Sequence, residues 1–305
     1  MNKFGEKRYN SFSYYMKNKF GKKIVKLSLD GGFTCPNRDG TLYDRGCIFC
    51  SSSGSGDFTY SNITIDEQIK KQIQLISKKW QNASYIAYFQ NFSNTYGKTI
   101  YELKKIYDSA LSQDNVIGIA IATRPDCLSD GVIELLSELN KKTFLFVELG
   151  LQTVHKKTSQ FLRLYYDIDD FDIAVKKLAQ QHIKTVAHTI VGLHGETERM
   201  IMQTYEHLNM LPVHGVKIQM LNILKKTDLA DIYHNFTPLL TLDEYVKTVC
   251  DIIQILRPDI VIHRLTGDGA KNLLIEPKWI LNKKNVLNSI DKELKRRDTY
   301  QGYDY

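Results

Sequence analysis

Seven short apolar runs alternate with helical patterns along most of the chain, and this alternation restricts the fold more than any other feature. The runs predict strands at 24–29, 85–89, 116–122, 144–151, 185–191, 215–221 and 260–265, and the periodic segments between them predict helices at 64–80, 99–111, 130–140, 169–182, 196–210 and 242–256. Continuous apolar strands separated by helices favour a parallel sheet covered by helices. With right-handed crossovers, the pattern predicts an α/β fold, a partial or full (β/α) barrel, ahead of an open doubly wound sheet.

No linker rich in Gly, Ser or Pro interrupts this pattern. We therefore expect a single catalytic domain at 24–265, with an N-terminal arm at 1–23 and a C-terminal extension at 266–305. The longest apolar run, VIGIAIA at 116–122, is far too short to cross a bilayer. The first residues lack the apolar region of a secretory signal. These features predict a cytoplasmic protein that has no membrane partner and keeps its cysteines reduced.

Three of the five cysteines, Cys35, Cys47 and Cys50, lie close together on the loop after the first predicted strand. In a barrel, the loops after the strands share the face that carries the active site. Iron–sulfur clusters are usually held by four cysteines, so three would leave one iron of a [4Fe–4S] cluster open. A zinc ion completed by a distant histidine is the alternative, since no histidine lies between residues 32 and 84. Cys127 and Cys250 stand outside any motif, and we expect both to be buried apolar residues.

Five stretches carry a resemblance to a known family: GFTCPNRDG at 32–40, YFQNFSNTY at 88–96, ATRPDCL at 122–128, VELGLQT at 147–153 and HRLTGDG at 263–269. With these stretches and its cysteine spacing, the chain resembles the radical S-adenosylmethionine (SAM) superfamily, in the branch that joins the catalytic subunit of Elongator with oxygen-independent coproporphyrinogen oxidase. The resemblance implies a [4Fe–4S] cluster and SAM as cofactors, and an electron donor such as a flavodoxin or ferredoxin. It also implies a 5′-deoxyadenosyl radical that abstracts hydrogen from an unreactive carbon.

The resemblance also implies roles for single residues. Cys35, Cys47 and Cys50 would hold the cluster, and its open iron would take the amine and carboxylate of SAM. The residues that would contact SAM are Phe49, Phe89, Gln90, Asn94, Thr123, Glu148, Gln152, Arg163, Ile190 and Gly192. For Glu148, a role in a salt bridge is the alternative. The chain departs from the family at Ala122, where Elongator-like sequences have Glu, at RLYYD (163–167), and at His194, where they have Pro.

The arm at 1–23 has a composition of its own, with seven basic side chains, one acid and six aromatic residues. Cations neutralise phosphates and aromatic rings stack on unpaired bases, so the mixture fits RNA binding. Packing of the rings on the barrel, with the lysines in solvent, is the alternative. A second basic stretch, KELKRR, lies at 292–297.

The Elongator resemblance and the basic arm together indicate transfer RNA as the partner, with the wobble uridine of the anticodon loop as the substrate. Relatives of this kind are linked to trimming a carboxymethylaminomethyl group at uridine C5 to aminomethyl, and the segment after the last predicted strand is too short for the Elongator acetyltransferase domain. A radical enzyme acting on a small metabolite or peptide is one alternative. A zinc- or cluster-stabilised RNA-binding protein without catalysis is the other.

The loops after the last strands are expected to bind the substrate, because the cluster and SAM occupy the earlier ones. His263, Arg264 and Asp268 end the last predicted strand and are the predicted catalytic, substrate-side residues, followed by Lys217 and Asn222. A salt bridge between Arg264 and Asp268 that closes the barrel is the alternative. We also expect aromatic or amide side chains at the barrel mouth, since these would hold a single uracil turned out of the RNA.

Overall fold

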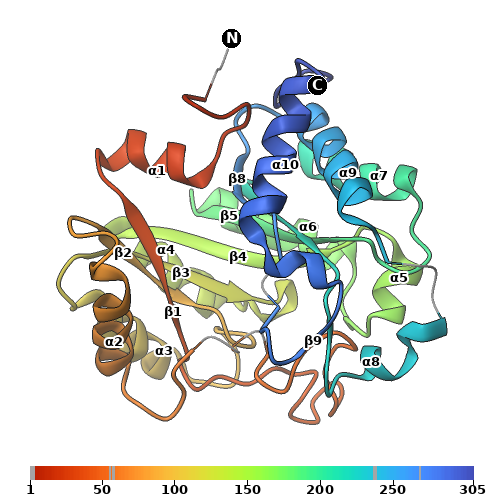
Figure 1. The fold of residues 1–305 in the computed structure, drawn as a ribbon. Coiled ribbons are helices and arrows are strands. Elements are labelled where there is room, and N and C mark those ends of the chain that lie inside the picture. Colours follow the sequence, from red (N-terminus) through yellow and green to blue (C-terminus); the bar gives the residue numbers. More distant parts are fainter. Residues whose placement is uncertain (1–3, 55, 57–58, 236–238, 268) are drawn as a thin grey trace.

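A parallel sheet of seven strands forms the centre of the molecule, seen in a computed structural model that describes residues 4–54, 56, 59–235, 239–267 and 269–305 (Figure 1). The strands, in their order across the sheet, are β1 (Ile24–Leu29), β2 (Ser84–Phe89), β3 (Val116–Thr123), β4 (Phe144–Gln152), β5 (Lys184–Val191), β6 (Gly215–Met220) and β8 (Val261–Arg264). The sheet is a half-barrel with β1 and β8 at its edges, which confirms the predicted fold class. All seven predicted strands are present, and no boundary differs by more than one residue.

Six helices make the predicted crossovers on the outside of the sheet. They are α2 (Ile65–Ser77), α3 (Ile100–Leu111), α4 (Asp130–Lys142), α6 (Ile168–Gln180), α7 (Glu198–Met210) and α9 (Leu242–Ile255). Helix α2 begins with the capping box that its sequence predicts, because Thr64 Oγ1 accepts from the Glu67 amide and the Glu67 carboxylate accepts from the Thr64 amide. No helix in the described part of the chain is both long and apolar enough to cross a membrane.

Several elements were not predicted. They are α1 (Phe12–Phe20), α5 (Lys156–Phe161), α8 (Asp228–Ile232), α10 (Lys283–Arg296), the small antiparallel pair β7 (Ile223–Leu224) and β9 (Leu274–Glu276), and three short 3₁₀ turns, η1 (Pro125–Cys127), η2 (Tyr233–Asn235) and η3 (Lys278–Leu281). Helix α10 belongs to the main core, since Val286, Ile290 and Leu294 are fully buried in it. The C-terminal extension therefore packs against α9 as part of the same body.

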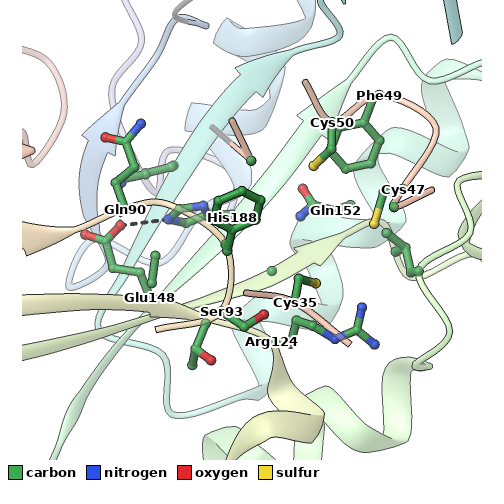
Figure 2. A pocket seen from close by; sticks show the side chains of 18 of the residues that line it. Cys35, Cys47, Phe49, Cys50, Gln90, Ser93, Arg124, Glu148, Gln152 and His188 are labelled. Atoms are coloured by element: carbon green, nitrogen blue, oxygen red, sulfur yellow. Dashed lines mark hydrogen bonds and ion pairs between the residues drawn. The ribbon is translucent and has the colours of Figure 1, made fainter. Parts of the chain in front are cut away.

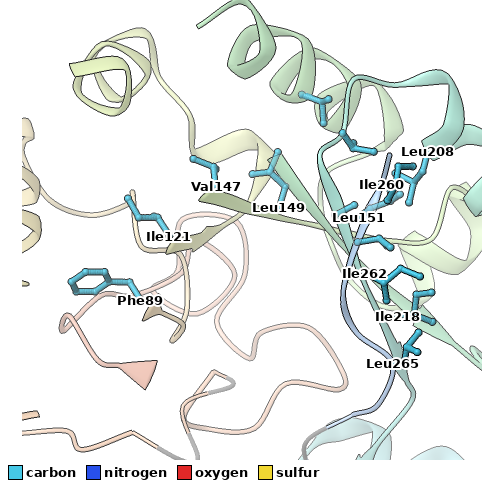
Figure 3. Close-up of a cluster of buried hydrophobic side chains, with 14 of the residues drawn as sticks. Phe89, Ile121, Val147, Leu149, Leu151, Leu208, Ile218, Ile260, Ile262 and Leu265 are labelled. Carbon is cyan, nitrogen blue, oxygen red and sulfur yellow. The ribbon is translucent and has the colours of Figure 1, made fainter. Parts of the chain in front are cut away.

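The main hydrophobic core lies between the convex face of the sheet and the helices (Figure 3). Alternate residues of a strand point to opposite faces of the sheet. Strand β4 shows this alternation, because Val147 and Leu149 enter the core while Phe146 and Glu148 point to the concave face. The side chains on the concave face do not pack against the outer helices and are therefore available for binding or catalysis.

Helix α1 lies across the concave face at the N-terminal ends of the strands, which we call the closed end. Met16 is buried there against Ile86, Phe146 and Val186, and Phe12 and Phe20 pack onto the same cluster. The ring of Phe12 lies 4.8 Å from that of His263, and the ring of Tyr15 lies 4.9 Å from that of His214. These aromatic rings of the arm thus pack on the sheet, while Lys17, Lys19 and Lys22 remain exposed.

Both edges of the half-barrel are covered. At the β8 edge, the Ile262 amide donates to the Asn10 carbonyl, and the Gln301 amide group holds the same segment by accepting from the Asn10 amide and donating to the Ile260 carbonyl. At the β1 edge, Gln68 and Gln72 of α2 bond the backbone of Asp30 and Ser28. Edge strands expose backbone N–H and C=O groups that have no partner strand, and these contacts provide hydrogen bonds for some of those groups. The first and last segments of the chain consequently meet at the β8 edge.

Candidate active site

The cysteine loop follows β1 and lies at the open end of the half-barrel, opposite α1. Asn37 is fully buried and donates to Cys47 Sγ (3.4 Å) and to the Arg163 carbonyl (2.8 Å). The Arg38 guanidinium donates to the carbonyls of Cys50 and Ser51 at 3.0 and 2.6 Å. Since both anchors bind backbone or sulfur, the loop is held in one shape although it has no regular secondary structure.

The three thiols of this loop are free, and their side chains border one hollow (Figure 2). A hydrogen bond from the Cys50 thiol lowers the pKa of Cys47 to about 7, and the same bond raises the pKa of Cys50. Arg124 lies in the same lining with only 6% of its surface exposed and is clamped by Asp126 through two hydrogen bonds of 2.9 and 2.7 Å. A buried cation beside thiols favours their thiolate form.

This hollow, which we call the thiol pocket, is partly open to solvent, and its empty space, the open mouth included, is about 930 Å³. Within the described part of the chain, no three His, Cys, Asp or Glu side chains are arranged to hold a metal ion. Cys35, Cys47 and Cys50 nevertheless all border this one hollow. Cys127 and Cys250, by contrast, are buried away from the pocket.

The structure brings half of the predicted SAM-contacting residues to this pocket. Phe49, Gln90, Thr123, Glu148 and Gln152 line it, and Ile190 lines a smaller adjoining pocket together with Phe49. Gln152 has a left-handed backbone (φ 64°) at a break in the β4–β5 register. Such a conformation is costly for a residue with a side chain, and it concentrates at functional sites.

Four other predicted SAM-contacting residues lie elsewhere. The Phe89 side chain belongs to the main core, and the Asn94 amide is buried on the backbone carbonyls of Phe89 and Ala122. Arg163 pairs with Asp228 and does not border the thiol pocket. Gly192 has a positive φ (83°) just after β5 and likewise lies outside the pocket lining.

A group of buried and half-buried polar side chains lies deeper in the pocket, and we call it the lumenal cluster: Lys26, Tyr88, Glu148, His188 and Lys217. The Glu148 carboxylate accepts from Lys26 Nζ (2.5 Å), from Lys217 Nζ and from His188 Nε2 (2.8 Å). Burial favours the neutral acid, yet the charges of the two lysines outweigh it and hold the pKa of Glu148 well below its usual value. The salt-bridge role expected as the alternative for Glu148 is thus present in the structure.

The predicted substrate-side residues are divided. Arg264 and Lys217 line the thiol pocket, and Asn222 lines the adjoining pocket with its Oδ1 buried and without a hydrogen-bond partner among the described residues. His263 lies toward the closed end, where its ring contacts Phe12 and its Nδ1 is 3.2 Å from Lys26 Nζ. Asp268 lies outside the described residues.

Sequence reasoning missed Lys26, His188 and Arg124. Lys26 and His188 each interrupt an otherwise apolar strand, in IVKLSL and TVAHTIV, at a position facing the concave side. The pattern that could have revealed both residues is a polar side chain at the concave-facing position of several strands. Arg124 lies within the motif ATRPDCL, but nothing in the sequence indicates that its guanidinium is buried beside the thiols.

Comparison with known proteins gives a consistent result. Residues 44–208 match the radical SAM superfamily and residues 213–296 match the radical SAM C-terminal domain. YtqA of Bacillus subtilis (strain 168) is 44% identical over 302 residues, which is 97% of this chain and 92% of that protein. The fold resembles the archaeal Elp3 of Methanocaldococcus infernus, with a TM-score of 0.69 at 13% identity over 91% of this chain and 64% of that one, so the chain spans less than two thirds of Elp3. It also resembles Streptococcus suis SuiB bound to S-adenosylmethionine, with a TM-score of 0.53 at 12% identity over 85% of this chain and 54% of that one.

Proposed function

This chain belongs to the radical SAM superfamily, and on that premise we propose that it trims the carboxymethylaminomethyl group of a wobble uridine in transfer RNA to aminomethyl. The family uses a [4Fe–4S] cluster and SAM. When bound, this pair supplies a 5′-deoxyadenosyl radical, which takes a hydrogen atom from an unreactive carbon. The protein's part is to hold the cofactors, exclude water and aim one carbon of the substrate at that radical.

The residues present fit these cofactors. Cys35, Cys47 and Cys50 offer three thiols and no fourth cysteine, which leaves one iron for an outside ligand. Arg124 places a buried positive charge beside them, and this offsets the negative charge of a thiolate-bound cluster. Phe49 and Ile190 in the adjoining pocket offer apolar surfaces to the adenine. These assignments are part of the proposal.

The observation that carries the substrate proposal is the order of side chains along the concave face. From the closed end outward, an apolar tier (Ile86, Phe146, Val186) is followed by the charged lumenal cluster and then by an amide tier (Gln90, Gln152, Gln219). We assign Gln90 and Gln152, which the family resemblance gives to SAM, to the substrate instead, because carboxamides match the donors and acceptors on the edge of a uracil. A group reaching past them meets charges, which suits an acidic, amine-containing substituent better than an apolar one.

The closed end also favours a macromolecule that inserts one group. Helix α1 lies across the far end of the concave face, so substrate reaches the lumenal cluster from the thiol side (Figure 1). An anticodon loop can turn a base outward at low cost because it is single-stranded. The likeness to Elp3 and the net charge of +7 support RNA as the carrier of that group.

The trimming reaction balances as an oxidation that consumes one water. The substituted amine loses its two-carbon acid as glyoxylate and becomes a primary amine, which releases two hydrogens. One would leave as a hydrogen atom to the adenosyl radical, whose formation from SAM takes one electron from the donor. The other would leave as a proton to solvent and an electron that returns to the same carrier, such as a flavodoxin or a ferredoxin, so that SAM is the net oxidant.

An anaerobic preparation tests the proposal. The protein, loaded with iron and sulfide to about four irons per chain, is incubated with dithionite, SAM and transfer RNA from cells lacking this chain. We expect 5-carboxymethylaminomethyluridine to disappear while 5-aminomethyluridine, glyoxylate and 5′-deoxyadenosine appear. Formation of 5′-deoxyadenosine with unchanged RNA would exclude RNA as the substrate and favour a metabolite or peptide. A zinc protein that leaves SAM intact would mean a non-catalytic role.

A further inference from the structure

One carboxylate lies between two lysines in the lumenal cluster, and the lysines reach it from opposite sides. Lys26 approaches Glu148 from the closed end, where its Nζ stands 4.9 Å from the ring centre of Phe12 and 5.2 Å from that of Phe146. Lys217 approaches the same carboxylate from the side that borders the thiol pocket. Lys26 is therefore enclosed by aromatic rings, and Lys217 faces the space where substrate enters.

The cluster holds more positive than negative charge. Glu148 is the one acid among its members, and Lys26 already provides its counter-charge on the enclosed side. Among the described residues, Lys217 Nζ donates to Glu148 and to Tyr88 Oη (2.8 Å), which uses two of its three N–H groups. Arg264 lies in the same pocket lining and adds a further cation. A buried ammonium with a remaining donor is a strong site for an anionic acceptor.

We propose that Lys217, with Arg264 in the same lining, binds a carboxylate of the substrate at the bottom of the thiol pocket. This inference rests on the proposed function, because the group to be trimmed ends in a carboxylate. It goes further by assigning the residues that distinguish the acidic substrate from its aminomethyl product. Lys217 would thus act as a specificity residue, and its loss should equalise the affinity for the two forms.

The dimensions agree with this assignment. Two residues along a strand advance by about 7 Å, which is the step from Tyr88 to Gln90 and from Lys217 to Gln219. The substituent has four bonds between uridine C5 and its carboxylate carbon and spans about 5 Å when extended. A uracil held at Gln90 and Gln219 would therefore place its carboxylate within reach of Lys217 Nζ.

The ionisation of the cluster supports the same reading. Burial lowers the pKa of Lys217 to about 7, and Lys26 and Arg264 act in the same direction against the attraction of Glu148. Burial also lowers the pKa of His188 to about 4, so this imidazole is neutral near pH 7 and does not compete for the anion. An arriving carboxylate would raise the pKa of Lys217 and bind it in the protonated state.

Binding of two RNA hairpins to the cofactor-loaded enzyme tests the inference. They share one anticodon stem-loop and carry either 5-carboxymethylaminomethyluridine or 5-aminomethyluridine, and binding is measured by fluorescence anisotropy. We expect the acidic hairpin to bind about tenfold or more tightly than the other, as a charged hydrogen bond predicts. Lys217→Met should reduce this ratio to near one, while Lys22→Met, an exposed lysine at the closed end, should leave it unchanged.

A second variant distinguishes a role of the cluster in substrate binding from a role in the fold alone, by whether it raises or lowers the ratio of hairpin affinities. Glu148→Gln removes the internal competitor for Lys217 and keeps the shape of the side chain. The ratio between the acidic and aminomethyl hairpins should hold or rise in this variant, although the fold loses the ion pairs of Glu148 with Lys26 and Lys217. A cluster that serves only the fold would lower the ratio in Glu148→Gln and Lys217→Met alike, and that result would overturn the inference.

A small probe makes the two proposals fail separately. N-methylglycine carries the amine and carboxylate of the substituent, and N-methylethanolamine has the same size without the carboxylate. We expect millimolar N-methylglycine to raise the Tm of the wild-type protein saturably, and to do so less in Lys217→Met. If N-methylglycine raises the Tm in a Lys217-dependent way but the protein does not bind RNA, the carboxylate site is supported and the RNA substrate is excluded. RNA turnover with an unchanged hairpin ratio in Lys217→Met would keep the proposed function and remove the site.

Discussion

The two ends of the half-barrel are built from similar residue types and use them in opposite ways. At the closed end, Phe12, Tyr15 and Met16 pack on the sheet, and the polar groups of the arm bond backbone at the β8 edge. At the open end, Phe49 borders a hollow and Arg124 is buried beside thiols. The difference teaches that aromatic and basic residues indicate a binding surface only when the fold leaves them facing empty space.

The arm illustrates the limits of composition most directly. Its mixture of rings and cations fits RNA binding and packing equally well in the sequence. In the structure, the rings named above are committed to packing, whereas the lysines of α1 are exposed. RNA binding by the arm, if measured, would therefore be carried by its lysines and not by base stacking.

The largest effect is expected at the open end. Cys35→Ala should remove the cluster and all cleavage of SAM, because three thiols leave no substitute for a lost ligand. Iron content and 5′-deoxyadenosine formation under dithionite measure this. Cys127→Ala and Cys250→Ala are matched controls that should keep both. A Cys35→Ala protein with its full iron content would contradict the proposed role of this thiol, and the same test applies to Cys47 and Cys50.

A comparable truncation at the closed end should cost stability and leave the chemistry intact. Met16 is 1% exposed, so Met16→Ala should lower the free energy of unfolding by about 2–5 kcal/mol through lost burial and a cavity. Urea unfolding of the apo-protein measures this, with the exposed neighbour Lys17→Ala as control. Iron per folded molecule should not change. Loss of iron at unchanged stability would mean that α1 serves the open end.

The closed end should also weaken in acid. Burial, reinforced by the charge of Lys184, lowers the pKa of His214 from 6.5 to about 4. Between these values the unfolded chain binds a proton that the folded chain refuses, so the stability present above pH 6.5 is lost as the pH falls toward 4. Allowing for partial exposure, the loss is about 2 kcal/mol. His214→Phe should flatten this part of the curve of unfolding free energy against pH, and an identical slope in the variant would contradict the assignment.

The smallest effect concerns the lysines of the arm, of which Lys17, Lys19 and Lys22 are exposed and Lys23 is half-buried. Changing Lys17, Lys19, Lys22 and Lys23 together to Glu should weaken binding of transfer RNA by about tenfold and flatten its salt dependence, because fewer counterions are released. Cleavage of SAM without substrate should be unaffected. Binding titrations at several salt concentrations measure both effects. An unchanged salt slope would reduce the arm to its packing role.

Much of the fold was predictable because parallel strands buried on both faces carry continuous apolar runs. Helix α1 was not predicted, although Ser11 and Gly21 mark its ends, because it has only nine residues and depends on contacts with the sheet. The grouping of Cys35, Cys47 and Cys50 on one loop is visible in the sequence, whereas their assignment to a cluster rests on the family resemblance. The lumenal cluster was not, since Lys26 and Glu148 are 122 residues apart and meet only when β1 and β4 enter one curved sheet.

The meeting of the two ends of the chain has a consequence for the order in which this protein matures. The segment that leads into α1 is held by Gln301, so residues 8–10 complete these contacts only after residue 301 has been made. During synthesis the sheet can form strand by strand, but its floor cannot be fixed until residue 301 has left the ribosome. A cluster inserted before that moment would lie in a half-barrel whose closed end is incomplete and whose interior is open to solvent. Assembly of a working centre should accordingly follow the synthesis of the segment that contains Gln301.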